Sequence, residues 1–255
     1  MIDVKILYED EQIIVCVKPP GMASQPERSS AMDLASWLKN YLAAKERSQR
    51  PDKTAKKGFA TPKSRPGAPY IGVVHRLDRP VGGVMVYAKT QRAAGELSRQ
   101  FSSHQTEKTY LALLTGRLPK STGTLTNFLQ KDGRTNTSSV VAAGGKKASL
   151  SYRELEAKRG LSLVEIRLQT GRHHQIRVQT AQAGAGIYGD MKYNPQHTKN
   201  WNEKEGIASG TPELCLFSCR LVFEHPVSHK KMCFKVLPEQ KMMTIDEWPS
   251  LSYYK

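Results

Sequence analysis

The sequence predicts an α+β fold with a mixed, largely antiparallel β-sheet flanked by helices. Short apolar or alternating segments of strand length recur along the chain, separated by turn-forming residues. Three other segments repeat apolar residues every three to four positions, as amphipathic helices do. Because 255 residues are enough to bury one substantial core, we expect a single domain over residues 1–255.

The strands are expected to pair mainly as hairpins. The first hairpin, ILYEDEQIIVCV, ends at the rigid turn KPPG, a later one turns at Lys158–Gly160, and the last one turns at PVSHK. The expected strand segments are 6–17, 70–74, 82–90, 108–118, 122–132, 137–145, 146–171, 214–226 and 230–238.

The expected helices have recognisable ends. In the first helix the apolar repeat runs from Leu34 to Leu42, with Ser30 or Asp33 near its start. Thr90 is expected to cap the second helix, and Gly184 to end the third. The expected helical segments are 32–44, 91–104 and 173–185.

The chain is strongly basic. Lysine and arginine number 39 against 23 acidic residues, which gives a net charge of +16. Such an excess favours a polyanionic partner, because neutralising phosphates releases counterions. A solubility surplus is the alternative, since the basic, apolar-poor segment 45–69 is expected to be a mobile insertion. Further cations accompany the motifs described below, which favours a binding role: Arg76, Arg79, Lys108, Arg172, Arg177 and Lys192.

Composition also narrows the setting. No apolar run approaches the roughly 18–20 residues that cross a bilayer, and the opening MIDVKILYEDEQ lacks the features of a secretory signal. We therefore expect a cytoplasmic protein without membrane contact. The four cysteines form no CxxC pair, and Cys215 and Cys219 on one strand would lie about 13 Å apart. We expect small buried thiols without a disulfide or shared metal ion.

The stretch GVVHRLDRPVGG, residues 72–83, presents an aspartate where a strand ends. Loops on a rigid scaffold commonly carry functional groups, although aspartate before Arg-Pro is also an ordinary turn former. On an extended segment, Arg76 and Asp78 share one face, while His75 and Leu77 share the other. The pattern thus places a positively charged side chain and a carboxylate on one surface.

The stretch LQTGRHHQIRVQ, residues 168–179, predicts a tight strand-to-helix turn at Gly171. His173 and Arg177 would then lie one helical turn apart. The adjacent His173 and His174 would point about 100° apart on the helix, so we expect no shared metal ion. Because cations at a helix N-terminus oppose the macrodipole, an acid or anion is expected beside them.

In a third stretch, TEKTYLALLTG, Lys108 and Tyr110 share one strand face, for which an ordinary half-buried tyrosine is the alternative. Together the three stretches resemble the signatures of the RluA-type pseudouridine synthases: HRLDRPVGG is similar to HRLDxxTSG, EKTYLALLTG to (E/K)KxYxAxVxG, and TGRHHQIRVQ to TGRxHQIRxH. ILYEDEQIIVCVKPPGM, IYGDMKY and LFSCRLVFEHP also resemble that family's motifs, so the resemblance covers nearly the whole chain. Val81, Gly82 and Phe217 depart from the usual pattern.

The resemblance implies a pseudouridine synthase fold and an enzyme that isomerises a uridine in structured rRNA or tRNA. It implies three catalytic residues. Asp78 acts as nucleophile or as a base in glycal formation, Tyr110 stacks on the base and takes the C5 proton, and Arg177 keeps Asp78 ionised. Arg76 fills the place of the flipped base and Ile176 lines the base pocket.

We expect phosphate contacts from Arg172, Lys108 and Lys18, together with the basic insertion. No cofactor or metal is expected, because the isomerisation needs none and no GxGxxG, P-loop or metal-spaced cluster occurs. The expected partner is RNA, and the expected state is a monomer. Two alternatives stay open: a catalytically silent RNA-binding or assembly factor, and a metal-dependent nuclease using His75, Asp78 and His174.

Overall fold

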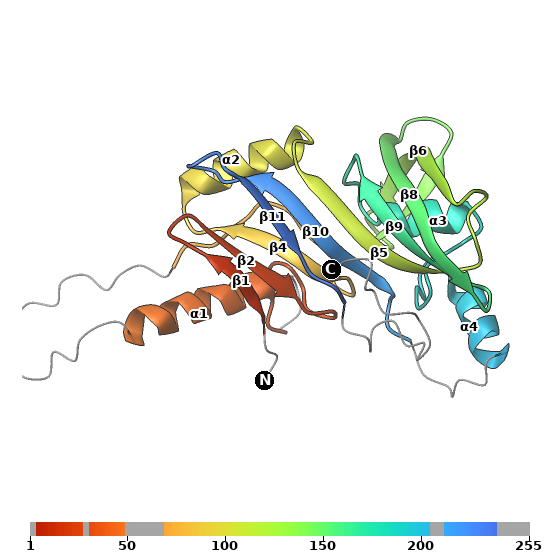
Figure 1. The fold of residues 1–255 in the computed structure, drawn as a ribbon, viewed down its shortest axis with the longest axis horizontal. Helices are drawn as coiled ribbons and strands as arrows, with labels where there is room; N and C mark the ends of the chain where they lie inside the picture. The colour runs from red at the N-terminus through yellow and green to blue at the C-terminus, as the bar shows by residue number, and fades with distance from the viewer. Residues whose placement is uncertain (1–3, 28–30, 49–68, 205–211, 239–255) are drawn as a thin grey trace, which may run out of the picture.

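The computed structural model describes residues 4–27, 31–48, 69–204 and 212–238. Within them, eleven strands form one mixed sheet with four helices around it, which confirms the predicted α+β class (Figure 1). The strands are β1 Ile6–Glu9, β2 Ile13–Lys18, β3 Gly72–Val73, β4 Gly82–Ala88, β5 Glu107–Thr115, β6 Thr122–Asp132, β7 Thr137–Val141, β8 Lys146–Lys158, β9 Leu161–Leu168, β10 Leu216–Glu224 and β11 Lys231–Lys235. The helices are α1 Leu34–Ser48, α2 Gln91–Ser102, α3 Gln175–Gln182 and α4 Pro195–Lys204.

The sheet brings distant motifs together through strand β10. Its order is β1-β2-β4-β10-β5-β9-β8-β6-β7, with β3 beside β4 and β11 beside β10. The pair β4–β10 is parallel, and the other described pairs are antiparallel. Strand β10 therefore lies between β4, which follows the HRLD motif, and β5, which carries Tyr110.

The helices cover the sheet because its strands are apolar on both faces in the β2–β4 region. Leu34 and Leu38 of α1 pack with Cys16 and Tyr87 in one core cluster. Leu97 of α2 packs on the opposite face in a second cluster with strand residues Ile13, Val15, Val84 and Val86. Figure 1 shows α1 and α2 on two sides of these strands and α3 at the other end of the molecule, beside β6.

Local signals in the sequence explain the element ends. The Asp33 carboxylate accepts from the Ser36 amide at 3.0 Å at the start of α1, and Thr90 accepts from the Ala93 amide at 3.2 Å at the start of α2. The β8–β9 hairpin turns at Arg159 and Gly160, which both have positive φ, as a tight hairpin turn requires. These three predictions are confirmed.

Four expectations need correction. Helix α1 continues to Ser48, so the first residues of the predicted insertion at 45–69 are helical; residues 49–68 lie outside the described part. Helix α4 was not predicted. Strand β3 has only two residues, Gly72 and Val73. Cys233 is exposed, whereas the other three cysteines are buried as expected.

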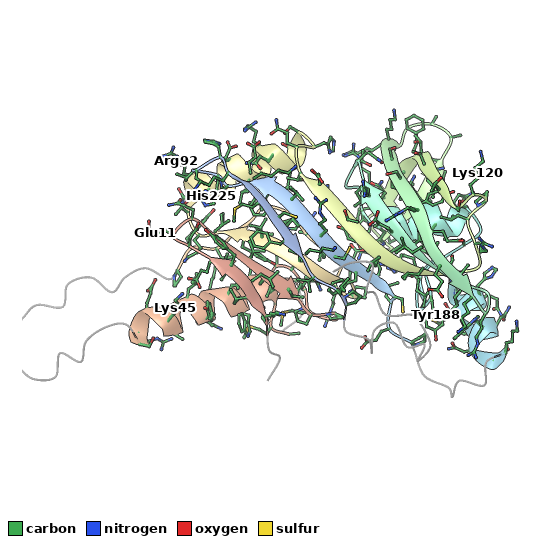
Figure 2. The ribbon with its side chains drawn as sticks, in the orientation of Figure 1. Glu11, Lys45, Arg92, Lys120, Tyr188 and His225 are labelled. Atoms are coloured by element: carbon green, nitrogen blue, oxygen red, sulfur yellow. The ribbon has the colours of Figure 1, made fainter. Side chains whose placement is uncertain are left out.

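A side-chain contact joins the β1–β2 turn to the end of β10. His225, just after β10, contacts Asp10 in the β1–β2 turn, with 2.9 Å between Nε2 and Oδ2. Figure 2 shows His225 close to Glu11 of that turn. None of the described helices is both long and apolar enough to span a membrane.

Candidate active site

Asp78 lies in the loop between β3 and β4, which is pinned on both sides. The buried Ser24 hydroxyl donates to the Leu77 carbonyl at 2.8 Å and accepts from the Leu77 amide at 3.1 Å. The Val81 amide then donates to the Asp78 carbonyl at 2.9 Å, which turns the chain into β4. Because Leu77 points inward, the Asp78 side chain points outward and stays 28% exposed.

Lys18 is not the surface phosphate contact that we expected. Its side chain is fully buried, and Nζ donates to the carbonyls of Pro19, Met22 and Arg79 at 2.6–3.0 Å. Burial lowers the pKa of Lys18 to about 7. The three carbonyls match the three hydrogens of an ammonium group, so Lys18 joins the KPPG turn to the residue that follows Asp78.

Arg177 of α3 connects two aspartates. Its Nη1 lies 3.4 Å from Asp78 Oδ2, as the resemblance implies, while Nε and Nη2 bind Asp190 at 2.7 and 2.8 Å. The Asp190 side chain is fully buried and also accepts from the amides of Lys192 and Tyr193. Burial alone would lower the pKa of Arg177, but Asp190 and then Asp78 raise it above its usual value. The guanidinium is therefore a fixed positive charge beside Asp78.

Asp190 is the residue of this site that sequence reasoning missed. The signal was available, because IYGDMKY is one of the motifs that resemble the family. The bidentate contact with Asp190 orients the guanidinium, which leaves Nη1 free to face Asp78. Asp190 and Asp78 are also the acids that we expected beside the basic start of α3.

The two histidines before α3 do not lie on the helix, because α3 begins only at Gln175. His174 has φ 52° and ψ 24°, a left-handed conformation that costs a non-glycine residue about 1 kcal/mol. The rings of His173 and His174 consequently stack, with centroids 3.7 Å apart, instead of pointing apart. His174 Nε2 lies 3.6 Å from Asp78 Oδ2.

Of the three residues of the nuclease hypothesis, Asp78 and His174 lie close to each other, whereas His75 is engaged elsewhere. His75 stacks on Phe101 of α2, and its Nε2 accepts from the Val86 amide of β4 at 3.1 Å. Its ring is thus committed to the packing of α2 against β4, while Asp78 and His174 face α3. Among the described residues no three His, Cys, Asp or Glu side chains gather as a metal site.

Tyr110 approaches the site across β10. It pairs with Ser218, which in turn pairs with Gly83, so the three residues form one row across β5, β10 and β4. A Cβ at Gly83 would collide with Ser218, and the φ of 131° there also favours glycine. Burial raises the pKa of Tyr110, and the charge of Asp78 adds to this rise. The phenol therefore keeps its proton near the Asp78 carboxylate.

The other residues predicted for the site differ in how far they are exposed to solvent. Ile176 is buried at the start of α3, next to Arg177. Burial lowers the pKa of Lys108. Its Nζ lies near Gly171, 3.6 Å from where a Cβ on that glycine would stand. Within the described part of the chain, the Lys108 ammonium group has no ion-pair partner. Arg172 donates from Nε to the Lys147 carbonyl at 3.0 Å, and Arg76 is exposed. These two guanidinium groups are accessible to a ligand.

A cavity of about 540 Å³ opens beside Arg177. Arg177 and Asp190 line one part of it, and Pro20, Gly21 and Pro80 line another. This volume is in the range of small-ligand pockets. Arg177 thus faces both the cavity and the Asp78 carboxylate.

Comparisons with known proteins identify the family of this chain. The model of the RNA pseudouridylate synthase family matches residues 12–182. "Ribosomal large subunit pseudouridine synthase D" of Neisseria meningitidis serogroup B is 33% identical over 234 residues, which are 90% of this chain and 57% of that protein. "Uncharacterized RNA pseudouridine synthase YlyB" of Bacillus subtilis is 30% identical over 96% of this chain and 72% of that protein.

Solved structures show the same fold. "Human RNA Pseudouridylate Synthase Domain Containing 4" superposes with a TM-score of 0.69 at 20% identity, covering 94% of this chain and 90% of that one. The Neisseria relatives are longer, and the chain spans 57% of their length. The family match covers most of the chain and includes Asp78, Tyr110 and Arg177. The chain therefore belongs to the RNA pseudouridylate synthase family.

Proposed function

We propose that this chain isomerises uridine in RNA to pseudouridine. The reaction breaks the bond between C1′ and N1, turns the uracil while it stays bound, and forms a bond between C1′ and C5. One observation carries the proposal: the Asp78 carboxylate lies 3.4 Å from a guanidinium that is itself fixed by a buried aspartate. That pair supplies a carboxylate that stays charged when RNA covers the loop.

The roles of Asp78 and Arg177 follow from this pair. Asp78 either attacks C1′ or removes a proton from the ribose to form a glycal; both routes need an ionised carboxylate. Arg177 supplies the positive charge that stabilises the ionised form. Asp190 positions Arg177 and does not touch the substrate.

Tyr110 and Ile176 form the walls of the site that holds the uracil. Tyr110 stacks on the uracil, and it removes the C5 proton only if it first passes on its own proton, because its pKa is raised. The variant Tyr110→Phe separates the two roles, since it keeps the ring and removes the hydroxyl. Retained C5 tritium together with intact RNA binding would support proton transfer, whereas normal turnover would leave stacking alone.

The exposed cations serve RNA binding. A paired uracil must leave its stack before it can react, at a cost of a few kcal/mol, and Arg76 fills the vacated place. Arg172 and Lys108 contact phosphates, which orient the RNA without specifying its sequence. We assign these roles to a monomer in the cytoplasm, with residues 1–255 as one catalytic domain, in which the basic segment around Lys53 to Lys63 adds phosphate contacts.

Release of tritium from 5-tritiated RNA tests the function. Two relatives named ribosomal large subunit pseudouridine synthase D make large-subunit rRNA the first substrate to try, with tRNA beside it. The wild-type chain should release tritium from one of them, and Asp78→Asn should not. Asp132→Asn is the matched control, because Asp132 is an exposed residue at the end of β6. The asparagine oxygen can accept from the Arg134 amide, and its NH2 group can donate to the Thr135 hydroxyl.

The outcomes separate the hypotheses. RNA binding without tritium release from either RNA would favour the silent assembly factor. Release that EDTA abolishes would point to a metal-dependent reaction instead. Comparison of pseudouridine maps from cells with and without the protein would then identify the uridine.

A further inference from the structure

His174 lies within the site but has no role in the chemistry described above. Its side chain is almost fully buried, between the ring of His173 and the edge of Tyr193. Its two nitrogens face different partners, Tyr193 Oη at Nδ1 and Asp78 Oδ2 at Nε2. The tautomer of His174 therefore decides whether Asp78 faces an N–H donor or an unprotonated nitrogen.

The Tyr193 hydroxyl fixes that proton. Tyr193 Oη accepts a hydrogen bond from the Ser138 amide at 2.8 Å and lies 2.7 Å from His174 Nδ1. Since one lone pair is occupied by the amide, the hydroxyl hydrogen is satisfied when it is donated to Nδ1. An unprotonated Nδ1 places the imidazole hydrogen on Nε2. That hydrogen then faces a carboxylate oxygen, which can only accept, so both ends of the ring favour the same tautomer.

The ring is also held neutral and in place. Burial lowers the pKa of His174 to about 3, with smaller contributions from Arg177, His173 and Lys192. The stacked His173 is itself held by the Ser138 hydroxyl, 2.9 Å from its Nδ1. Ser138 of β7 thus supports both histidines, one through its amide and Tyr193, the other through its side chain.

We propose that His174 is a positioning residue for Asp78: a neutral imidazole, set by Tyr193 in the Nε2-protonated form, that donates to Asp78 Oδ2. This inference rests on the proposed function. Arg177 Nη1 faces the same oxygen, so two donors fix the rotation of the carboxylate. In the described part of the chain no hydrogen bond or ion pair reaches Oδ1, which is left for the substrate. The 3.6 Å separation is longer than a hydrogen bond, and we expect it to shorten when RNA binds, as catalytic hydrogen bonds commonly do.

Two substitutions separate the two nitrogens of the ring. In His174→Gln the amide NH2 replaces Nε2–H and can still donate to Asp78. In His174→Asn the amide oxygen replaces Nδ1 and can still accept from Tyr193. We expect the glutamine variant to keep most of kcat and the asparagine variant to lose about 10- to 100-fold, with KM little changed.

A merely structural role predicts the reverse order. Asparagine tolerates the left-handed backbone of His174 better than glutamine does, so His174→Asn should be the more stable variant while being the slower enzyme. His197→Asn is the matched control, because His197 is exposed on α4 and should leave both stability and kcat unchanged. Equal kcat in the two His174 variants, or a faster asparagine variant, would overturn the proposal.

Nitrogen-15 NMR tests the tautomer without using activity. The His174 resonances, assigned by their loss in His174→Gln, should show a protonated Nε2 and an unprotonated Nδ1 at pH 7. Tyr193→Phe keeps the ring but removes the hydroxyl, and should yield a mixture of tautomers. Protonated Nδ1 in the wild-type protein would refute the inference even if the chain isomerises uridine. An inactive chain with the expected tautomer would refute the proposed function instead.

Discussion

Two histidine–aspartate pairs in this molecule have similar exposure but differ in how completely they are bonded. The Asp10 side chain is 29% exposed and the Asp78 side chain 28%. Asp10 accepts from the Tyr8 hydroxyl, the Gln12 and Ile13 amides and His225 Nε2, at 2.8–2.9 Å. Both of its oxygens are therefore committed to the fold.

The Asp78 carboxylate is held more loosely. Arg177 and His174 face one of its oxygens at 3.4 and 3.6 Å, and the other oxygen makes no hydrogen bond or ion pair with the described residues. In both pairs a group at Nδ1 sets the histidine tautomer: backbone amides of Val227 and Ser228 for His225, and the Tyr193 hydroxyl for His174. Bonding, and not exposure, distinguishes Asp10, which is committed to the fold, from Asp78, to which we assign the chemistry.

The largest effect is expected from Arg177→Met, which removes the cation that both Asp78 and Asp190 share. Turnover should fall by about 10³-fold or more, and unfolding free energy by about 3–5 kcal/mol, because Asp190 stays buried without its cation. Urea denaturation and tritium release measure the two losses. Arg220→Met, which breaks an exposed pair with Glu107, should cost under about 1 kcal/mol and leave turnover intact. Retained turnover in Arg177→Met would remove Arg177 from the mechanism.

Asp10→Asn should lower the free energy of unfolding by about 1.5–3 kcal/mol, because it weakens several hydrogen bonds to a charged group. Asp78→Asn should change it by about 1 kcal/mol or less, since its partners are distant and partly solvated. Urea denaturation of both variants checks this contrast. A larger stability loss in Asp78→Asn would make Asp78 the structural acid.

Acid should destabilise the fold through two neutral histidines, the buried His174 and the half-buried His75. Burial lowers the pKa of both His75 and His174 to about 3, whereas an unfolded histidine titrates near 6.5. The unfolded chain thus binds more protons below pH 6.5, and stability falls from there towards pH 3, by about 2 kcal/mol per histidine at pH 5. His75→Gln, which retains an acceptor for the Val86 amide, should lose about 2 kcal/mol less between pH 7 and 5. An unchanged loss would show that His75 does not stay a neutral ring in the folded chain.

The smallest effect concerns RNA affinity. Binding should weaken steeply with salt, and Arg172→Gln should weaken it several-fold on every RNA and reduce the slope of log K against log salt by about 1. Filter binding at several salt concentrations measures both. A slope identical to that of the wild-type chain would exclude a phosphate contact by Arg172.

The sequence was informative where local pattern decides structure. Alternation predicted the hairpins, and Thr90 was identified as a cap because hydroxyls accept from helix amides. The pairing of Asp78 with Arg177 came from the resemblance, since no local pattern relates residues 99 positions apart. Helix α4, PQHTKNWNEK, was missed because Thr198 is its only fully buried residue and no apolar stripe marks it.

Two other predictions were wrong because of features that no local pattern shows, a contact between distant segments and one residue of unusual φ. Lys18 looked like a surface cation, but a carbonyl 61 residues away completes its buried set of acceptors. His173 was placed on α3 because the helical spacing continues through it, whereas the left-handed backbone at His174 delays the helix to Gln175. Periodicity does not reveal one residue of unusual φ, so the stacked histidines could not be foreseen.

Single-turnover tritium release by Asp10→Asn and Asp78→Asn, at equal concentrations of folded protein, tests the account most directly. We expect Asp10→Asn to match the wild-type rate within about twofold, and Asp78→Asn to be slower by about 10³-fold or more. Comparable rates in the two variants would contradict the assignment of Asp78 as the reactive acid.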